Sequence, residues 1–152
     1  MHQIQKVVAA VVVEDGRILV AQRARGAQAG KWEFPGGKVE AGETLRAALV
    51  RELQEELAVK VQVGPRIMAL PFSSNGMRLR LIAFYARHAS GVFTPLSHRA
   101  IDWVGPDELA RIDLAPPDIP VALKVQAQWG VIPWARIHRS DGPRPADPPI
   151  RR

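Results

Sequence analysis

The sequence has no cysteine among its 152 residues, and aromatic side chains make up only 6% of it. The absence of cysteine excludes disulfide bonds and thiolate metal sites, and it is compatible with a reducing cytosol. Few aromatics beside the basic residues argue against a surface that stacks single-stranded nucleic acid. The longest early apolar run, residues 7–13, is too short for a membrane span or a signal peptide. We therefore expect a cytoplasmic protein without a membrane partner.

Composition and charge are those of a globular protein. Hydrophobic residues make up 47% of the chain, which is long enough to bury roughly two-thirds of its unfolded surface in one domain. The formal net charge is +6, and a basic surface with a solvated tail explains it at least as well as a nucleic-acid site. We predict one domain over residues 1–139, a Pro/Arg-rich tail over residues 140–152, and a monomer or weak dimer that does not bind nucleic acid.

Apolar runs and turn signals predict a sheet flanked by helices. Residues 6–13 form a continuous, β-branched run that is typical of a strand covered on both faces. Asp15-Gly16 is a strong hairpin turn, and residues 18–22 return from it. Further strands are predicted at residues 61–70 (interrupted by Gly64-Pro65), 79–86 and 100–104, and helices after Pro106 and at residues 121–129.

The densest chemistry lies in residues 36–59, where a glycine-rich turn leads into a helix. Each helical residue advances by about 100°, so Glu52, Glu55 and Glu56 fall within one narrow sector. Such bunched carboxylates repel one another by roughly 0.2–0.5 kcal/mol per i,i+4 pair. A hard cation reverses that sign, and Mg²⁺ takes a few carboxylates together with substrate phosphates. The adjoining apolar stripe, which should face the core, is Leu45, Leu49, Leu53 and Leu57.

By themselves, these glutamates are also typical of the solvated face of an amphipathic helix. The complete string, however, resembles the Nudix box, in which Gly, Glu, Arg-Glu and Glu-Glu recur at set spacings. The residues that match in one register are Gly37, Glu43, Arg51, Glu52, Leu53, Glu55, Glu56 and Val59. Only the final glycine is missing, because Ala58 stands there, and a left-handed helix end without glycine costs about 1 kcal/mol. The flanking sequence Trp32-Glu33-Phe34-Pro35-Gly36-Gly37-Lys38 narrows the resemblance to the MutT-like branch.

The resemblance implies an α/β (α+β) Nudix fold, with a mixed β-sheet sandwiched between α-helices. It also implies a hydrolase that cleaves a nucleoside triphosphate to the monophosphate and pyrophosphate, using Mg²⁺, for which Mn²⁺ can substitute. The implied metal ligands are Glu52, Glu55, Glu56 and the Gly36 carbonyl. Arg51 and Glu43 complete the implied catalytic set, in which Arg51 orients the glutamates by pairing with Glu55 or by reaching Glu43.

Substrate contacts are implied from Arg23 to phosphate and from Asp118 to the nucleobase. Both residues have structural alternatives, because Arg23 fits an ordinary surface arginine and Asp118 fits the N-cap of the following helix or the entry to it. Arg78 and Arg80 share one face of a strand, as substrate contacts or as solvated edge residues. The complete expected substrate-binding set is Arg23, Phe34, Gly37, Lys38, Arg78, Arg80 and Asp118.

The general base is left open by the sequence. MutT-like chains often carry a glutamate in the loop before the last strand, and Ser97 occupies that position here. Serine is a poor base, so Glu52, Glu56 and the neighbouring His98 remain candidates.

The nucleobase is likewise open. The MutT-like flanks favour an oxidised purine triphosphate such as 8-oxo-dGTP, and hence a role in sanitising the nucleotide pool. The first alternative is a pyrimidine triphosphate such as CTP or 5-methyl-dCTP, which an aspartate at position 118 suits. A further alternative is a non-catalytic Nudix-fold module that binds nucleotides or nucleic acid, against which the intact glutamates argue.

Overall fold

The computed structural model describes residues 4–131, and the predicted tail at residues 140–152 lies outside them. The strands are β1 (Gln5–Glu14), β2 (Arg17–Gln22), β3 (Trp32–Glu33), β4 (Gly36–Lys38), β5 (Val59–Ser74), β6 (Met77–Gly91) and β7 (Ala100–Val104). The helices are α1 (Leu45–Leu57) and α2 (Asp118–Gln128), with 3₁₀ turns η1 (Glu108–Ala110) and η2 (Trp129–Val131). The elements expected from the sequence are present, and the short strands β3 and β4 are additional.

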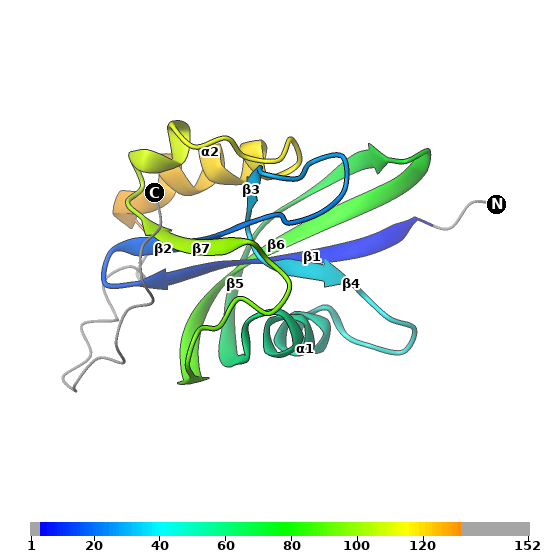
Figure 1. The fold of residues 1–152 in the computed structure, drawn as a ribbon, viewed down its shortest axis with the longest axis horizontal. Coiled ribbons are helices and arrows are strands. Elements are labelled where there is room, and N and C mark those ends of the chain that lie inside the picture. Colours follow the sequence, from blue (N-terminus) through cyan, green and yellow to red (C-terminus); the bar gives the residue numbers. More distant parts are fainter. Residues whose placement is uncertain (1–3, 132–152) are drawn as a thin grey trace.

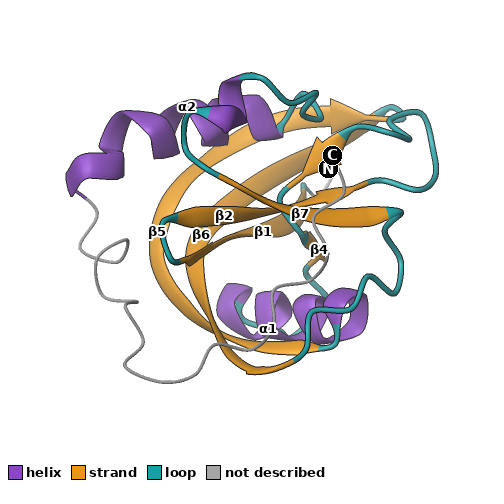
Figure 2. Cartoon of the chain, turned by 60° about the vertical axis from the view of Figure 1, so that its left-hand side comes forward, coloured by secondary structure: helices purple, strands orange, loops and turns teal. Residues whose placement is uncertain are grey.

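The strands form one mixed sheet, with α1 against one face and α2 against the other (Figures 1 and 2). The order along the sheet is β3-β2-β1-β6-β5, with β4 joined to β1 and β7 joined to β2. This arrangement confirms the predicted mixed sheet between helices. Within residues 4–131, no helix is long and apolar enough to cross a membrane.

β1 lies in the middle of the sheet and is buried on both faces. Its side chains alternate between two cores, so that Val8 packs in the core that contains Leu53 of α1, and Val11 packs in the core that contains Val125 of α2. Residues 8–13 are at most 3% exposed, which confirms the predicted strand with both faces covered. On one side β1 pairs in parallel with β6, the long inner strand of the following hairpin.

On its other side, β1 has two different partners. β2 pairs with it only beside the Asp15-Gly16 turn, and β4 pairs with residues 7–9. Gly36 is required in β4, because a Cβ at this position would lie 1.9 Å from the carbonyl oxygen of Val8. This close approach fixes the glycine pair of residues 36–37 beside the helix that carries the glutamates.

The β5–β6 hairpin is longer than the sequence indicates, and Gly64-Pro65 does not interrupt β5. The pairing register shifts between Val63 and Arg66 instead, as in a β-bulge. Nη1 of Arg46 on α1 donates to the carbonyl oxygens of Val63 and Gly64, at 3.2 and 3.0 Å. These hydrogen bonds satisfy carbonyl groups at the bulge of an edge strand, so the strand continues through a sequence that predicts a break.

α1 begins and ends at defined caps. The Oγ1 atom of Thr44 accepts a hydrogen bond from the backbone N–H of Ala47 at 3.1 Å. The expected apolar stripe is buried at Leu49, Leu53 and Leu57. At the other end, Ala58 adopts the left-handed conformation that the box normally gives to glycine, with φ 57° and ψ 31°.

Ala58→Gly is therefore expected to raise the free energy of unfolding by about 1 kcal/mol, because glycine removes the Cβ strain of the left-handed conformation. Urea denaturation of both proteins measures the change. Ala47→Gly, at an exposed position of the same helix, is the opposite-sign control and should cost about 0.5–1 kcal/mol. If Ala58→Gly were no more stable than the wild type, the left-handed backbone at Ala58 would carry no Cβ strain, and the prediction would be contradicted.

Candidate active site

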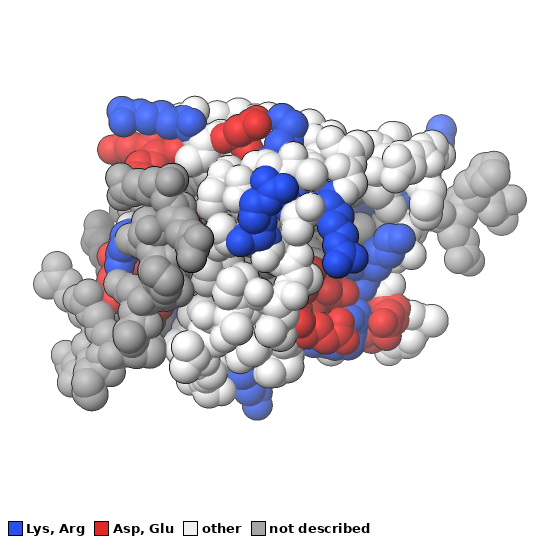
Figure 3. Space-filling model, in the orientation of Figure 1, with Lys and Arg blue, Asp and Glu red and all other residues white. Residues whose placement is uncertain are grey.

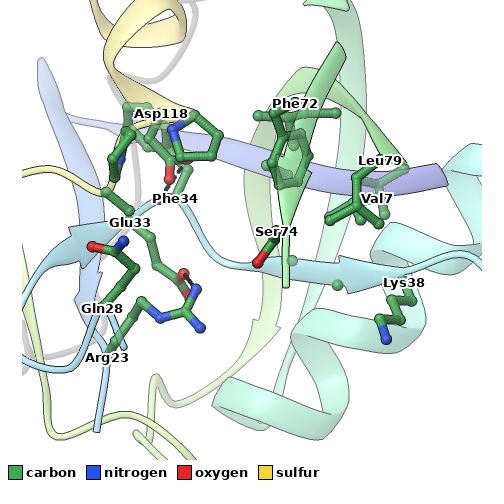
Figure 4. A pocket seen from close by; sticks show the side chains of 18 of the residues that line it. Val7, Arg23, Gln28, Glu33, Phe34, Lys38, Phe72, Ser74, Leu79 and Asp118 are labelled. Carbon is green, nitrogen blue, oxygen red and sulfur yellow. Dashed lines mark hydrogen bonds and ion pairs between the residues drawn. The ribbon is translucent and has the colours of Figure 1, made fainter. Parts of the chain in front are cut away.

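A cavity of about 1020 Å³ is lined by β1, β3, β4, the β5–β6 hairpin and the segments before β7 and α2. The predicted site residues that line it are Arg23, Phe34, Gly36, Gly37, Lys38, Glu56 and Asp118. Those outside its lining are Glu43, Arg51, Glu52, Glu55, Arg78 and Arg80. Asp118 and Phe34 lie at one end of the cavity and Lys38 at the other (Figure 4). Of the residues outside the lining, Arg78 and Arg80 lie on β6, and the other four form a charged cluster on and just before α1.

Arg51 holds the charged cluster on α1 together. Its Nε and Nη2 atoms each donate to the Glu43 carboxylate at 2.8 Å. Its Nη1 atom donates to Glu52 at 3.0 Å and to Glu55 at 3.2 Å. The hydrogen bond from Arg51 lowers the pKa of Glu43 to about 2, and the same contact raises the pKa of Arg51. Both pairings expected of Arg51 are therefore present at once. In Figure 3, acidic side chains gather beside basic ones at the lower right of the face shown.

Gly37 faces the carboxyl group of Glu52. A Cβ at Gly37 would lie 2.4 Å from Cδ of Glu52 and 2.5 Å from each of its oxygens. The Glu52 side chain is 14% exposed, whereas that of Glu55 is 58% exposed. Glu52 is therefore fixed between a glycine and an arginine, and Glu55 is largely in solvent.

Glu56 is the glutamate of α1 that reaches the cavity. Its Oε2 atom is buried without a hydrogen-bond partner, and its carboxyl group is hydrogen-bonded to the backbone of Gly36. Burial raises the pKa of Glu56 to about 7, and the negative charges of Glu33 and Glu52 add to the shift. A buried carboxyl oxygen without a partner is costly unless a cation or donor binds it.

The oxygen donors around Glu56 fit a hard divalent cation. Within residues 4–131, no group of three histidine, aspartate or glutamate side chains is arranged to hold a metal ion by itself. Mg²⁺ does not need such a cage, because it usually binds one or two carboxylates together with water and substrate phosphates. The unpartnered oxygen of Glu56 and the carboxylate of Glu52 supply donors of this kind.

β3 has only two residues, yet it brings distant segments together at the other end of the cavity. One edge pairs with β2. On the other edge, the Trp32 N–H donates to the carbonyl of Asp113, and the Ala115 N–H donates to the carbonyl of Trp32, both at 2.8 Å. The residues that follow Trp32 therefore lie beside the start of α2.

Glu33 is a cavity residue that the sequence analysis did not select. Its Oε1 atom accepts a hydrogen bond from Nη1 of Arg23 at 3.0 Å, and its Oε2 atom lies 2.9 Å from Nε2 of His98. Arg23 and Glu33 point toward each other in Figure 4. Its place within Trp32-Glu33-Phe34-Pro35-Gly36-Gly37-Lys38, the stretch that carries the MutT-like resemblance, was the available signal.

Asp118 is buried beside Glu33 and does not cap α2. Pro117 is at the N-cap position and Asp118 is the first residue of α2, so Asp118 lies at the entry of the helix and not at its cap. Oδ1 of Asp118 accepts a long, 3.5 Å hydrogen bond from the Phe34 N–H. Burial, followed by the negative charge of Glu33, raises the pKa of Asp118 to about 8. At neutral pH this side chain therefore carries both a donor and an acceptor.

The raised pKa of Asp118 predicts a pH-dependent stability. The folded protein holds this proton more tightly than the unfolded chain, so the contribution of Asp118 to the free energy of unfolding falls from about pH 4 to about pH 8. Between pH 5 and pH 8, Asp118→Asn should gain on the order of 2–4 kcal/mol relative to the wild type. Urea denaturation of both metal-free proteins at each pH measures this difference. Glu56 is present in both proteins, so its titration cancels when they are compared. If the free energies of unfolding of the wild type and Asp118→Asn changed in parallel with pH, the raised pKa of Asp118 would be contradicted.

Arg78 and Arg80 are exposed and lie outside the cavity lining. They alternate along β6 with Leu79 and Leu81, which do line it. Because neighbouring strand residues face opposite ways, the two arginines project from the other face of the sheet. Their exposure matches the alternative of solvated residues, although β6 is an inner strand of the sheet and not an edge.

The loop before β7 carries Ser97 and His98, and both residues line the cavity. Its backbone is attached to the end of α1, because the Thr94 N–H donates to the Leu57 carbonyl and the Leu96 N–H donates to the Glu56 carbonyl, each at 2.9 Å. Carbonyl groups at the end of the helix are thereby satisfied by this loop.

Comparisons with known proteins show the family to which the chain belongs. The NUDIX domain profile matches residues 3–125, so the chain belongs to the Nudix family and is a hydrolase of the MutT type. Members of this family act on nucleotides and generally use divalent metal ions, usually Mg²⁺.

Individual relatives differ in the nucleotide they are named for. The chain is 44% identical over 117 residues to the CTP pyrophosphohydrolase of Escherichia coli K12, covering 76% of this chain and 87% of that protein. It is 31% identical over 127 residues to the 8-oxo-dGTP diphosphatase of the same organism, covering 83% and 98%. The solution structure of the E. coli ORF135 protein matches with a TM-score of 0.77 and 39% identity, covering 87% of this chain and 95% of that one.

Proposed function

We propose that the chain hydrolyses a nucleoside triphosphate to the monophosphate and pyrophosphate, with Mg²⁺ as its metal ion and Mn²⁺ as a substitute. One observation carries the proposal: the cavity joins the unpartnered carboxyl oxygen of Glu56 to the acidic pair Glu33 and Asp118. A triphosphate bound along it would place phosphates at Glu56 and the base at the acidic pair. The volume of about 1020 Å³ suffices for a purine or a pyrimidine nucleotide.

The proposed metal ligands are the carboxylates of Glu52, Glu55 and Glu56 and the carbonyl of Gly36. The three carboxylates do not surround one point in this structure, so the exposed side chain of Glu55 would have to turn toward the ion. Mg²⁺ bound there would neutralise phosphate charge and lower the pKa of the attacking water. Arg51 and Glu43 keep the glutamates in place. Lys38 and Arg23 lie on opposite sides of the cavity (Figure 4), and their positive charges would attract the phosphates.

Glu56 is the proposed general base. The water oxygen bonds to one phosphorus atom of the α–β bridge, and the P–O bond between that phosphorus and the bridging oxygen breaks. The bridging oxygen stays on the other phosphorus, so the products are the monophosphate and pyrophosphate. The proton of the water passes to a carboxyl oxygen of Glu56, the glutamate of α1 that lines the cavity. Ser97 has no role in this transfer.

The acidic pair favours a base that presents an amino group. Glu33 only accepts hydrogen bonds, and protonated Asp118 both donates and accepts. The amino and ring-nitrogen edge of cytosine fits this pair, in line with the relative named for CTP. Guanine-type bases also present N–H donors, in line with the relative named for 8-oxo-dGTP. Uracil has no amino group.

The test is release of pyrophosphate from CTP, 5-methyl-dCTP, 8-oxo-dGTP, dGTP and UTP, each with and without Mg²⁺. We expect Mg²⁺-dependent release, with kcat/KM at least about tenfold higher for the best amino-bearing base than for UTP. Release of inorganic phosphate instead, or none from any triphosphate, would refute the proposal. Salt-sensitive oligonucleotide binding without hydrolysis would favour a binding module.

A further inference from the structure

His98 makes a buried contact that the proposed chemistry leaves unused. Its side chain is 5% exposed, and its Nε2 atom lies 2.9 Å from Oε2 of Glu33. Its other ring nitrogen, Nδ1, is buried without a hydrogen-bond partner. One ring nitrogen therefore has a hydrogen-bond partner and the other has none.

This geometry fixes the tautomer of His98. The carboxylate of Glu33 only accepts hydrogen bonds, so Nε2 must carry the proton and donate it. A proton on Nδ1 would have no acceptor, whereas an unprotonated Nδ1 leaves only a lone pair without a partner. The ring is thus a donor aimed at Glu33.

His98 is also the rigid part of the contact. Its loop is tied to two elements, because the Leu96 N–H donates to the carbonyl of Glu56 on α1 and the Arg99 N–H donates to the carbonyl of Gln22 on β2, both at 2.9 Å. Arg23, the other partner of Glu33, has a side chain that is 40% exposed. A long, half-exposed arginine restricts a carboxylate less than a buried ring on an anchored loop does.

We propose that His98 is a positioning residue for nucleotide binding: its Nε2–H fixes the Glu33 carboxylate so that the remaining lone pairs face the base of the substrate. With one oxygen held by Arg23 and the other by His98, Glu33 keeps acceptor capacity on both oxygens. This inference rests on the proposed function, because it assigns Glu33 to the base end of a nucleotide site.

Two substitutions separate hydrogen bonding from packing. In His98→Gln, the amide nitrogen lies the same number of bonds from Cα as Nε2 and can donate to Glu33. In His98→Leu, the space is largely filled and the donor is lost. Calorimetry with the non-hydrolysable α,β-methylene analogues of CTP and 8-oxo-dGTP measures binding without turnover. We expect His98→Leu to weaken binding of the preferred analogue about tenfold, and His98→Gln to stay within about threefold of wild type.

The control and the coupled variant complete the experiment. His88 is the control, because its Nε2 atom contacts the Gly91 carbonyl outside the cavity, and His88→Leu should leave binding unchanged. In a Glu33→Gln background, His98→Leu should cause no more than about a twofold further loss, since its partner is already altered. Thermal unfolding checks that each variant is folded.

The outcomes distinguish this inference from the proposed function. Equal binding by wild type and His98→Leu, or equal weakening in His98→Leu and His98→Gln, would overturn the positioning role. In hydrolysis, the change is expected in KM, with kcat within about threefold. Tight binding with no pyrophosphate release by the wild type would refute the proposed reaction and leave the positioning role standing. No binding of either analogue to the wild type would overturn both.

Discussion

Glu56→Gln is expected to lower Mg²⁺-dependent pyrophosphate release by about three orders of magnitude while the protein stays folded. The substitution removes the proposed base and one proposed cation ligand together. It keeps the size of the side chain and its contact with the backbone of Gly36. Because burial destabilises the charged form of Glu56, the metal-free variant should be at least as stable as the wild type at pH 8.

The measurements are kcat/KM for the best triphosphate, the dissociation constant of Mg²⁺, and urea denaturation at pH 8. Glu108→Gln is the matched control, since it makes the same chemical change on η1, away from the cavity. Near-normal Mg²⁺-dependent turnover in both Glu56→Gln and Glu52→Gln would remove the α1 glutamates from the reaction. A loss of activity accompanied by unfolding would show a structural role instead.

Gly37→Ala is expected to lower activity by about a hundredfold through Glu52. The new Cβ would lie 2.4 Å from Cδ of Glu52, so the carboxyl group must move away from the position that Arg51 gives it. The obstructing group is the end of a side chain, which can shift without unfolding the protein. Misplacement of a site group by about 1 Å is enough for a loss of this size.

A paired comparison shows whether the loss is local. Gly105→Ala is the control, because the nearest atom to its new Cβ is 4.0 Å away and the position lies outside the cavity. Steady-state kinetics with a Mg²⁺ titration measures both variants. The loss in Gly37→Ala should appear as weaker apparent Mg²⁺ affinity as well as lower kcat. Normal kinetics in Gly37→Ala would mean that activity does not depend on the position of the Glu52 carboxyl group.

The sequence predicts the fold and the α1 cluster well, because both depend on local spacing. The helical period alone places Leu49, Leu53 and Leu57 in the core and the glutamates beside them. The left-handed end of α1 at Ala58 also follows from the box. Arg51 reaches both Glu43 and Glu55, which its i,i+4 spacing and the adjacent turn allow.

The end of the cavity that holds Glu33 and Asp118 could not be predicted in the same way. Glu33, His98 and Asp118 lie on three separate segments, and no local period relates them. They meet because the two-residue strand β3 is held between β2 and the segment before α2. Arg78 and Arg80 show another limit of local patterns. Side chains two residues apart in a strand share a face of the sheet, but the spacing does not say which face borders the cavity.

The parallel pairing of β1 with β6 has a consequence for how the enzyme is made. Gln5 lies opposite Leu79, so this ladder forms only after a long loop closes, whereas both hairpins can fold locally. The walls of the cavity come from both sides of that ladder. A chain that has folded only its hairpins therefore has no complete cavity, and we expect catalytic competence to arrive only with this least local step of folding.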